Sequence, residues 1–229
     1  MHKKSQIYPK NQKPIYMIIP GFIGNYKEGF IKNLYNHLKN EKKDIYGVKF
    51  NGHSDNEKNL ANPNEMAKHL KNEYLKIKKK YPSKKIIIIA HSQGCAITLK
   101  AHYFFKKSTS LILIAPAVFL DKIILPRINH EDIKLIKSGK PTLCKVSQSK
   151  FKIIDRKWIS AYEKFSLEKK LPKIKQHCLI VRPLGDFTDK KNALVLANKI
   201  PQNSYIEMNT NHWFDNSPSD IQEFAKKIF

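Results

Sequence analysis

Short apolar runs alternate with longer amphipathic stretches along this 229-residue chain. The apolar runs predict strands at Ile15–Ile19, Ile45–Phe50, Lys85–Ala90, Ser110–Ala115, His177–Arg182 and Ser204–Met208. The amphipathic stretches predict helices at about Tyr26–Asn40, Pro63–Tyr81, Gln93–Lys106, Asp189–Ile200 and Ser217–Ile228. Such alternation is typical of βαβ units that build a parallel sheet, and continuous apolar strands fit a sheet that is covered on both faces.

One interval, from Ala117 to Gln176, breaks this alternation. It contains short helical patterns separated by Pro126, Pro141 and Pro172, and no convincing strand. An interval of that length inside a compact α/β sheet is usually a functional lid. We therefore expect an α/β core formed by residues 1–116 and 177–229, and a helical cap or lid insertion formed by residues 117–176.

The net charge of +24 raises the question of an anionic partner. The lysines are spread along the whole chain, so compositional bias explains them about as well as a ligand does. No zinc-finger spacing and no aromatic RNA-binding signature accompanies them. Nucleic acid is therefore not expected as the primary partner.

Cysteine content and terminal sequence bear on localisation. The three cysteines, Cys95, Cys144 and Cys178, form no CxxC pair, which favours a reducing compartment over a disulfide framework. The charged N-terminus has no apolar stretch of the secretory kind behind it, and no segment approaches the ~20 apolar residues that span a bilayer. These features predict a cytoplasmic protein without transmembrane segments.

The stretch "IIIIAHSQGC" (Ile86–Cys95) contains the strongest chemical signal. Ser92 stands at a predicted strand-to-helix junction with the small residues Ala90 and Gly94 on either side, which is the pattern of a nucleophile elbow. The preceding strand is the most apolar in the chain and is expected to be central, where ligands bind beyond the carboxyl ends of the strands. The alternative is that Ser92 only caps the following helix.

Two other side chains are alternative candidates for the nucleophile. Ser54, in "GHSDN", has a similar setting, but Asn56 is not small and no long amphipathic helix begins directly after it. Cys95 falls inside the helix predicted after Ser92, where packing explains it more simply. Ser92 remains the predicted nucleophile.

A serine nucleophile needs a base and an acid that orients the base. With an elbow of this kind the two follow in the order acid, then histidine, in loops after later strands. The sequence offers Asp186 in "LGDFTD" and His212 in "TNHWFD". Asp189 is the competing carboxylate, although it more naturally caps the next helix, and His212 could instead be a surface histidine.

An oxyanion would require two N–H donors. One is the N–H that follows the nucleophile, at Gln93, and the other should come from the loop after the first strand, "IIPGFIGN". Gly21 would let that backbone approach the substrate, which makes the Phe22 N–H the second candidate. The alternative is an ordinary Pro-Gly turn.

Taken in order, "PGFIG", "NGHSDN", "AHSQG", "RPLGDFTD" and "NHWF" resemble motifs of the α/β-hydrolase superfamily, in particular its small cap-bearing esterase, lipase and thioesterase-like members. The motifs cover nearly the whole chain. Pro20 stands where the family usually has histidine, and Pro183 where it has glycine. The resemblance implies a serine hydrolase that cleaves carboxylic esters through an acyl-enzyme, without metal or cofactor.

Specificity would then depend on the insertion. We expect its apolar residues, among them Phe119, Trp158 and Tyr162, to face the serine and bind the acyl or alcohol group of a small-molecule ester; the alternative is that they only pack the insertion onto the sheet. Two further functions stay open. One is hydrolysis of acyl thioesters or of esters on an acidic acyl carrier protein, which a basic face would recognise, and the other is a noncatalytic binding protein of the same fold.

Overall fold

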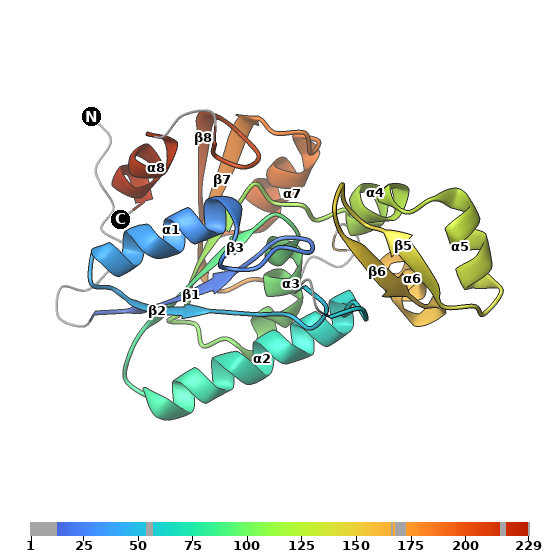
Figure 1. Cartoon of the computed structure of the whole chain (residues 1–229). Helices are drawn as coiled ribbons and strands as arrows, with labels where there is room; N and C mark the ends of the chain where they lie inside the picture. The colour runs from blue at the N-terminus through green and yellow to red at the C-terminus, as the bar shows by residue number, and fades with distance from the viewer. Residues whose placement is uncertain (1–12, 54–56, 166, 168–172, 216–218, 229) are drawn as a thin grey trace.

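A computed structural model describes residues 13–53, 57–165, 167, 173–215 and 219–228. Its main feature is a six-stranded parallel sheet with the strand order β2–β1–β3–β4–β7–β8 (Figure 1). The strands are β1 (Ile15–Ile19), β2 (Asp44–Gly47), β3 (Ile86–His91), β4 (Ser110–Ile114), β7 (His177–Gly185) and β8 (Asn203–Asn211). All six predicted core strands form, and the expected α/β class is confirmed.

Helices cover both faces of this sheet (Figure 1). On one face lie α1 (Gly29–Asn40) and α8 (Asp220–Ile228), and on the other lie α2 (Pro63–Lys80), α3 (Gln93–Ala101) and α7 (Lys191–Lys199). A 3₁₀ turn, η1 (His102–Phe104), follows α3. The predicted start of the last helix, Ser217, lies outside the described residues. No helix within the described ranges is long and apolar enough to cross a membrane.

The isoleucines of β3 show why the strands are continuously apolar. Ile86 and Ile88 pack into the layer under α2 and α3, whereas Ile87 and Ile89 pack into the layer under α1 and α8. None of the four is more than 2% exposed. Because successive side chains of a strand point to opposite faces, a strand covered on both sides needs apolar residues at every position.

β7 and β8 each extend three residues beyond their predicted ends, Arg182 and Met208. Pro183 lies within the added length of β7, although proline cannot donate to a ladder of hydrogen bonds. The pairing of β7 with β4 stops at Val181, so Pro183 has a strand partner on the β8 side alone, beside a register shift. The added residues of β7 and β8 end side by side at Gly185 and Asn211, so the segments that follow the two strands begin at the same edge of the sheet.

The insertion, residues 117–176, leads from β4 to β7 and lies at one side of the sheet (Figure 1). It contains α4 (Leu120–Ile124), η2 (Leu125–Arg127), α5 (His130–Lys137), β5 (Thr142–Lys145), β6 (Phe151–Ile154) and α6 (Arg156–Glu163). The expectation that this interval contains no strand is wrong, because β5 and β6 pair as an antiparallel hairpin. Strands of four residues give too short an alternation to be recognised in the sequence.

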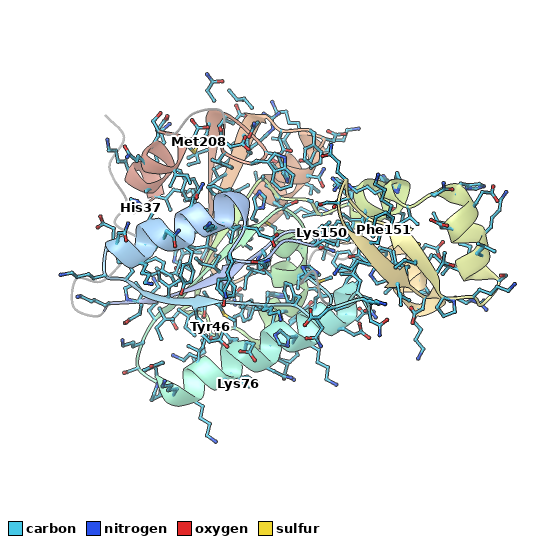
Figure 2. All side chains as sticks on the ribbon, in the orientation of Figure 1. His37, Tyr46, Lys76, Lys150, Phe151 and Met208 are labelled. Atoms are coloured by element: carbon cyan, nitrogen blue, oxygen red, sulfur yellow. The ribbon has the colours of Figure 1, made fainter. Side chains whose placement is uncertain are left out.

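Long-range contacts attach this hairpin to the core. The Ile153 N–H donates to the Lys58 carbonyl at 2.8 Å, and Lys152, only 1% exposed, donates from Nζ to the Glu57 carbonyl at 2.6 Å. Lys150, at the junction between the hairpin and the main body (Figure 2), forms an ion pair with Glu28 at 3.1 Å. The hairpin is therefore joined to two different loops of the core.

Candidate active site

Ser92 occupies a sharp turn between β3 and α3. Its φ of 53° and ψ of −122° lie in a region that residues other than glycine rarely adopt. The turn is fixed by backbone bonds: Ser92 N–H donates to the Ile114 carbonyl at 2.9 Å, and the Ser92 carbonyl accepts from Cys95 N–H at 3.0 Å and Ala117 N–H at 3.2 Å. The Ser92 side chain makes no capping hydrogen bond to α3, so the helix-cap interpretation has no support.

Two glycines let β1 and its following loop approach this turn. A Cβ at Gly94 would lie 2.5 Å from the Pro20 carbonyl oxygen, closer than real Cβ atoms come to backbone. A Cβ at Gly21 would lie 3.1 Å from the Ser92 Cβ. The loop after β1 therefore passes directly beside the serine, where the predicted second oxyanion donor would have to be.

The N–H groups of Phe22 and Gln93 are both available in this arrangement. Gln93 is the first residue of α3, so its N–H has no partner within the helix. Among the described residues, neither N–H finds a hydrogen-bond acceptor. Two donors from different loops are thus unengaged near the elbow.

Asp186 and His212 follow directly after β7 and β8. The pairing of Gly185 with Asn211 brings the next residue of each strand side by side, and His212 Nδ1–H donates to Asp186 Oδ1 at 2.7 Å. Their side chains are only 1% and 2% exposed. The two residues predicted as base and acid are therefore in direct contact.

The environment of Asp186 keeps it ionised. Burial alone would raise the pKa of its carboxyl, but the hydrogen bond with His212 and a second one from the Thr188 N–H, at 2.8 Å, outweigh burial, and the pKa is lowered. Asp189 is exposed and accepts from the Lys191 N–H at 2.8 Å, at the start of α7. The N-cap of α7 is Lys190, so Asp189 bonds the first helical N–H from one residue further out and is not the N-cap that was expected.

His91 connects the serine to the histidine-aspartate pair. Its Nε2–H donates to the His212 carbonyl at 2.9 Å, and the two rings lie 4.9 Å apart. His212 Nε2 is buried and has no hydrogen-bond partner among the described residues, so no bond yet joins it to Ser92. His91 was not among the predicted site residues, although it directly precedes the predicted nucleophile.

Two exposed aromatic side chains form a rim around His212, here called the aromatic rim. The Phe187 ring lies 4.3 Å from the His212 ring and is 55% exposed, and the Trp213 ring lies 4.8 Å from it and is 49% exposed. The sequence analysis did not single them out. Their positions, each next to a predicted member of the triad, were the available signal.

The insertion brings two of its three predicted substrate-binding residues to the elbow. Tyr162, fully buried, accepts a hydrogen bond from the side chain of Gln93. Trp158, 2% exposed, lies with its ring 4.1 Å from that of Tyr162 and 6.5 Å from that of Phe22. Phe119 is half-buried and donates its N–H to Asn192 Oδ1 at 3.2 Å, which places it towards α7.

Two cavities adjoin these residues. One of about 270 Å³ lies beside the loop after β1 and is lined by Gly21, Phe22, His91 and Trp213 among others. A larger one of about 570 Å³ lies between the core and the insertion and has Trp158 in its wall. Small-molecule sites are commonly concave and partly apolar in this way.

The remaining candidates can be placed briefly. Ser54 lies outside the described residues. Cys95 is buried, its thiol donates to the Ala90 carbonyl at 3.2 Å, and burial raises its pKa, so it has no thiolate character. The three cysteines are all unpaired. Within the described ranges, no group of three or more His, Cys, Asp or Glu side chains is placed to hold a metal ion.

Comparison with known proteins gives a family and a fold. A family model described as serine aminopeptidase, S33, matches residues 10–171. No curated protein matches the sequence. Similar solved structures include a putative hydrolase from Agrobacterium vitis (16% identity, 95% of this chain and 88% of that chain covered, TM-score 0.70). Another is α/β hydrolase domain-containing protein 10 from mouse (17% identity, 96% of this chain and 90% of that chain covered, TM-score 0.69). A third is Est1E from Butyrivibrio proteoclasticus with ferulic acid bound (16% identity, 96% of this chain and 92% of that chain covered, TM-score 0.64).

The close approach at Gly94 predicts that adding a single methyl group there destabilises the fold. Gly94→Ala should lower the free energy of unfolding by about 1–3 kcal/mol, because the backbone carbonyl in its way cannot move without distorting β1. Gly24→Ala, where the nearest atom is 3.7 Å away, is the matched control and should change stability little. Urea unfolding followed by circular dichroism measures both, and equal effects would contradict the packing described for the elbow.

Burial of His91 predicts acid sensitivity. Burial, together with the neighbouring His212, lowers the pKa of His91 from 6.5 to about 3. The unfolded chain therefore binds a proton below pH 6.5 that the folded protein does not, and this contribution to stability, complete above pH 6.5, is lost as the pH falls towards 3.

Substitution His91→Gln, which keeps a donor and cannot titrate, isolates this effect. Between pH 7 and pH 5 the unfolding free energy of the wild type should fall by about 2 kcal/mol more than that of His91→Gln. His130→Gln, at an exposed position, is the control. Parallel pH profiles for wild type and His91→Gln in chemical denaturation would show that His91 is not held neutral.

Proposed function

The chain belongs to the serine aminopeptidase S33 family, a family of α/β-hydrolases, and on this basis we propose that it hydrolyses carboxylic esters with Ser92 as nucleophile, His212 as general base and Asp186 as the acid that orients His212. The observation that carries the proposal is the buried Asp186–His212 pair, whose His212 carbonyl accepts a hydrogen bond from His91, the residue directly before the strained serine turn. A base oriented by a carboxylate is the arrangement that activates a serine hydroxyl.

The hydrogen bond to Asp186 sets the protonation of His212. Because a carboxylate only accepts, Nδ1 carries the proton and Nε2 presents its lone pair. A hydrogen bond between Ser92 Oγ and His212 Nε2 is the step the mechanism requires, and catalytic hydrogen bonds of this kind are often incomplete without substrate. Ser92 Oγ then attacks the ester carbonyl while Nε2 takes its proton, and His212 returns that proton to the departing alkoxide.

The second half of the reaction uses the same groups. Water, deprotonated by His212 Nε2, attacks the acyl-enzyme and releases the acid and free Ser92. In both halves the negative charge on the carbonyl oxygen would be met by the N–H groups of Phe22 and Gln93, which have no other acceptor among the described residues. Gly21 lets the first of these reach the site.

We assign the insertion, residues 117–176, the role of a cap over this site. Its Tyr162 is hydrogen-bonded to the side chain of Gln93, whose N–H is the proposed donor. Trp158 stands between Tyr162 and Phe22. A cap in this position excludes water and so strengthens the electrostatic interactions at the oxyanion, while Phe119 and Trp158 provide apolar surface for the acyl or alcohol group.

A second candidate is hydrolysis of acyl thioesters, including those on an acidic carrier protein. The same nucleophile would serve, and the net charge of +24 would attract an acidic partner. A substrate panel distinguishes the classes: 4-nitrophenyl esters from acetate to palmitate, methyl ferulate, acyl thioesters and an amino-acid 4-nitroanilide. A higher kcat/KM for thioesters than for esters would favour the second candidate. A higher kcat/KM for the anilide than for esters would favour a peptidase.

Removal of the nucleophile tests the proposal directly. Ser92→Ala should lower hydrolysis of 4-nitrophenyl butyrate by at least about 10³-fold and abolish labelling by a fluorophosphonate, with the fold intact. Ser110→Ala, at another buried serine on β4, is the control and should retain both. If Ser92→Ala were labelled like wild type, Ser92 would not be the nucleophile.

The two carboxylates after β7 provide a matched pair. Asp186→Asn should lower kcat by roughly 10³–10⁴-fold with little loss of stability, because an amide can favour the wrong tautomer of His212. Asp189→Asn, which alters only the start of α7, should cost far less. Steady-state kinetics with 4-nitrophenyl butyrate measures both, and the reverse order would assign the acid to Asp189.

A further inference from the structure

Arg127 extends from the insertion to aromatic rings beside the proposed active site. It ends η2, and its guanidinium carbon lies 6.0 Å from the ring centroid of Phe22 and 5.5 Å from that of Phe187. Phe22 comes from the loop after β1, and Phe187 directly follows Asp186. One cation is thus in contact with rings from both loops that flank the site.

These two rings are themselves parts of the site. Phe187, which Arg127 contacts, lies 4.3 Å from the His212 ring, so the guanidinium and the proposed base contact the same ring. Phe22 bears the N–H proposed to bind the oxyanion. A group of the substrate that extends a few ångströms outward from the scissile carbonyl would therefore pass Arg127.

Among the residues that the structure describes, Arg127 has no anionic partner. Within the described residues it forms no ion pair and no hydrogen bond, whereas Arg182 pairs with Glu207 at 2.9 Å. A guanidinium has five N–H donors and no acceptor. Although Arg127 is exposed as a whole, burial around its guanidinium lowers its pKa, which indicates partial loss of water. An anion here would be bound more strongly than at an open surface.

The choice of residue type is also informative. Of the 43 basic residues, three are arginines, at positions 127, 156 and 182. A chain that otherwise uses lysine for positive charge has the planar guanidinium at this position. Stacking on aromatic rings and bidentate binding of a carboxylate are the properties that distinguish arginine from lysine.

We propose that Arg127 is a specificity-determining residue that binds a carboxylate on the substrate, so that the enzyme prefers esters whose acyl group ends in a carboxylate over uncharged esters of the same length. This inference rests on the proposed ester hydrolysis at Ser92. A carboxylate fits better than a phosphate, because Lys150, the other cation beside Phe22 in the cavity described above, is already paired with Glu28. The aromatic rim of Phe187 and Trp213 would contact the intervening methylene groups.

A competing explanation is that Arg127 only holds the insertion against the two loops. In that case its loss would lower the stability of the fold and would lower the activity towards all substrates alike. The two explanations therefore differ in whether the effect depends on the charge of the substrate.

The test compares mono-4-nitrophenyl adipate with 4-nitrophenyl hexanoate, which share the acyl length and the leaving group and differ in one terminal carboxylate. The wild type should have the higher kcat/KM for the adipate ester. Arg127→Met should lower the adipate-to-hexanoate ratio about tenfold or more, mainly through KM, since charge-assisted hydrogen bonds are lost. Arg127→Lys, which keeps the charge without the planar fork, should lower the ratio by less.

Arg156→Met is the matched control, because Arg156 is exposed and belongs to the same insertion, and the substitution removes the same charge. It should leave the ratio unchanged, which excludes a general effect of net charge. A wild type without preference, or an Arg127→Met variant that loses both esters equally together with its melting temperature, would overturn the inference while leaving ester hydrolysis in place. If wild type hydrolysed neither ester, the proposed function itself would fail.

Discussion

The close approach of the Ser92 turn to the end of β1 is the constraint on which the site depends. Gly94 allows the Pro20 carbonyl to come where a side chain would otherwise stand, and the loop that follows then passes the serine at Gly21. Backbone bonds from β4 and from the start of the insertion hold the same turn. Three elements are thereby brought together around a residue whose backbone conformation would be unfavourable in isolation.

The parallel sheet gives the second half of the site in a similar way. β7 and β8 run side by side for nine residues each. Because parallel strands end at the same edge, the residues that follow them lie close together. The pairing of β7 with β8 therefore brings Asp186 into contact with His212. His91, the last residue of β3, then joins this pair to the serine turn through the His212 carbonyl.

The sequence predicted the features that depend on local pattern. The core strands followed from their apolar runs, and the meeting of Asp186 with His212 followed from chain order. The β5–β6 hairpin was missed because each of its strands has four residues, too few for their alternation to be recognised. Arg127 was missed because nothing near it in the sequence indicates which rings it will contact. The roles of Ser92, Asp186 and His212 remain predictions until they are tested.

The attachment of the hairpin has a consequence for how substrate could enter. On that side the insertion is tied to the core by a backbone bridge between Asn59 and Ile153 and by the buried ammonium of Lys152. A swing of the whole insertion would have to break backbone pairing and leave a buried charge without its acceptor, at a cost of several kcal/mol. Near η2, Arg127 contacts the rings of the half-buried Phe22 and the exposed Phe187, and the N–H groups of Val118 and Phe119 bond to Asn192 of α7. Entry of substrate past η2 would therefore require the side-chain contacts of Arg127 to separate, which costs less than breaking the backbone pairing at the hairpin.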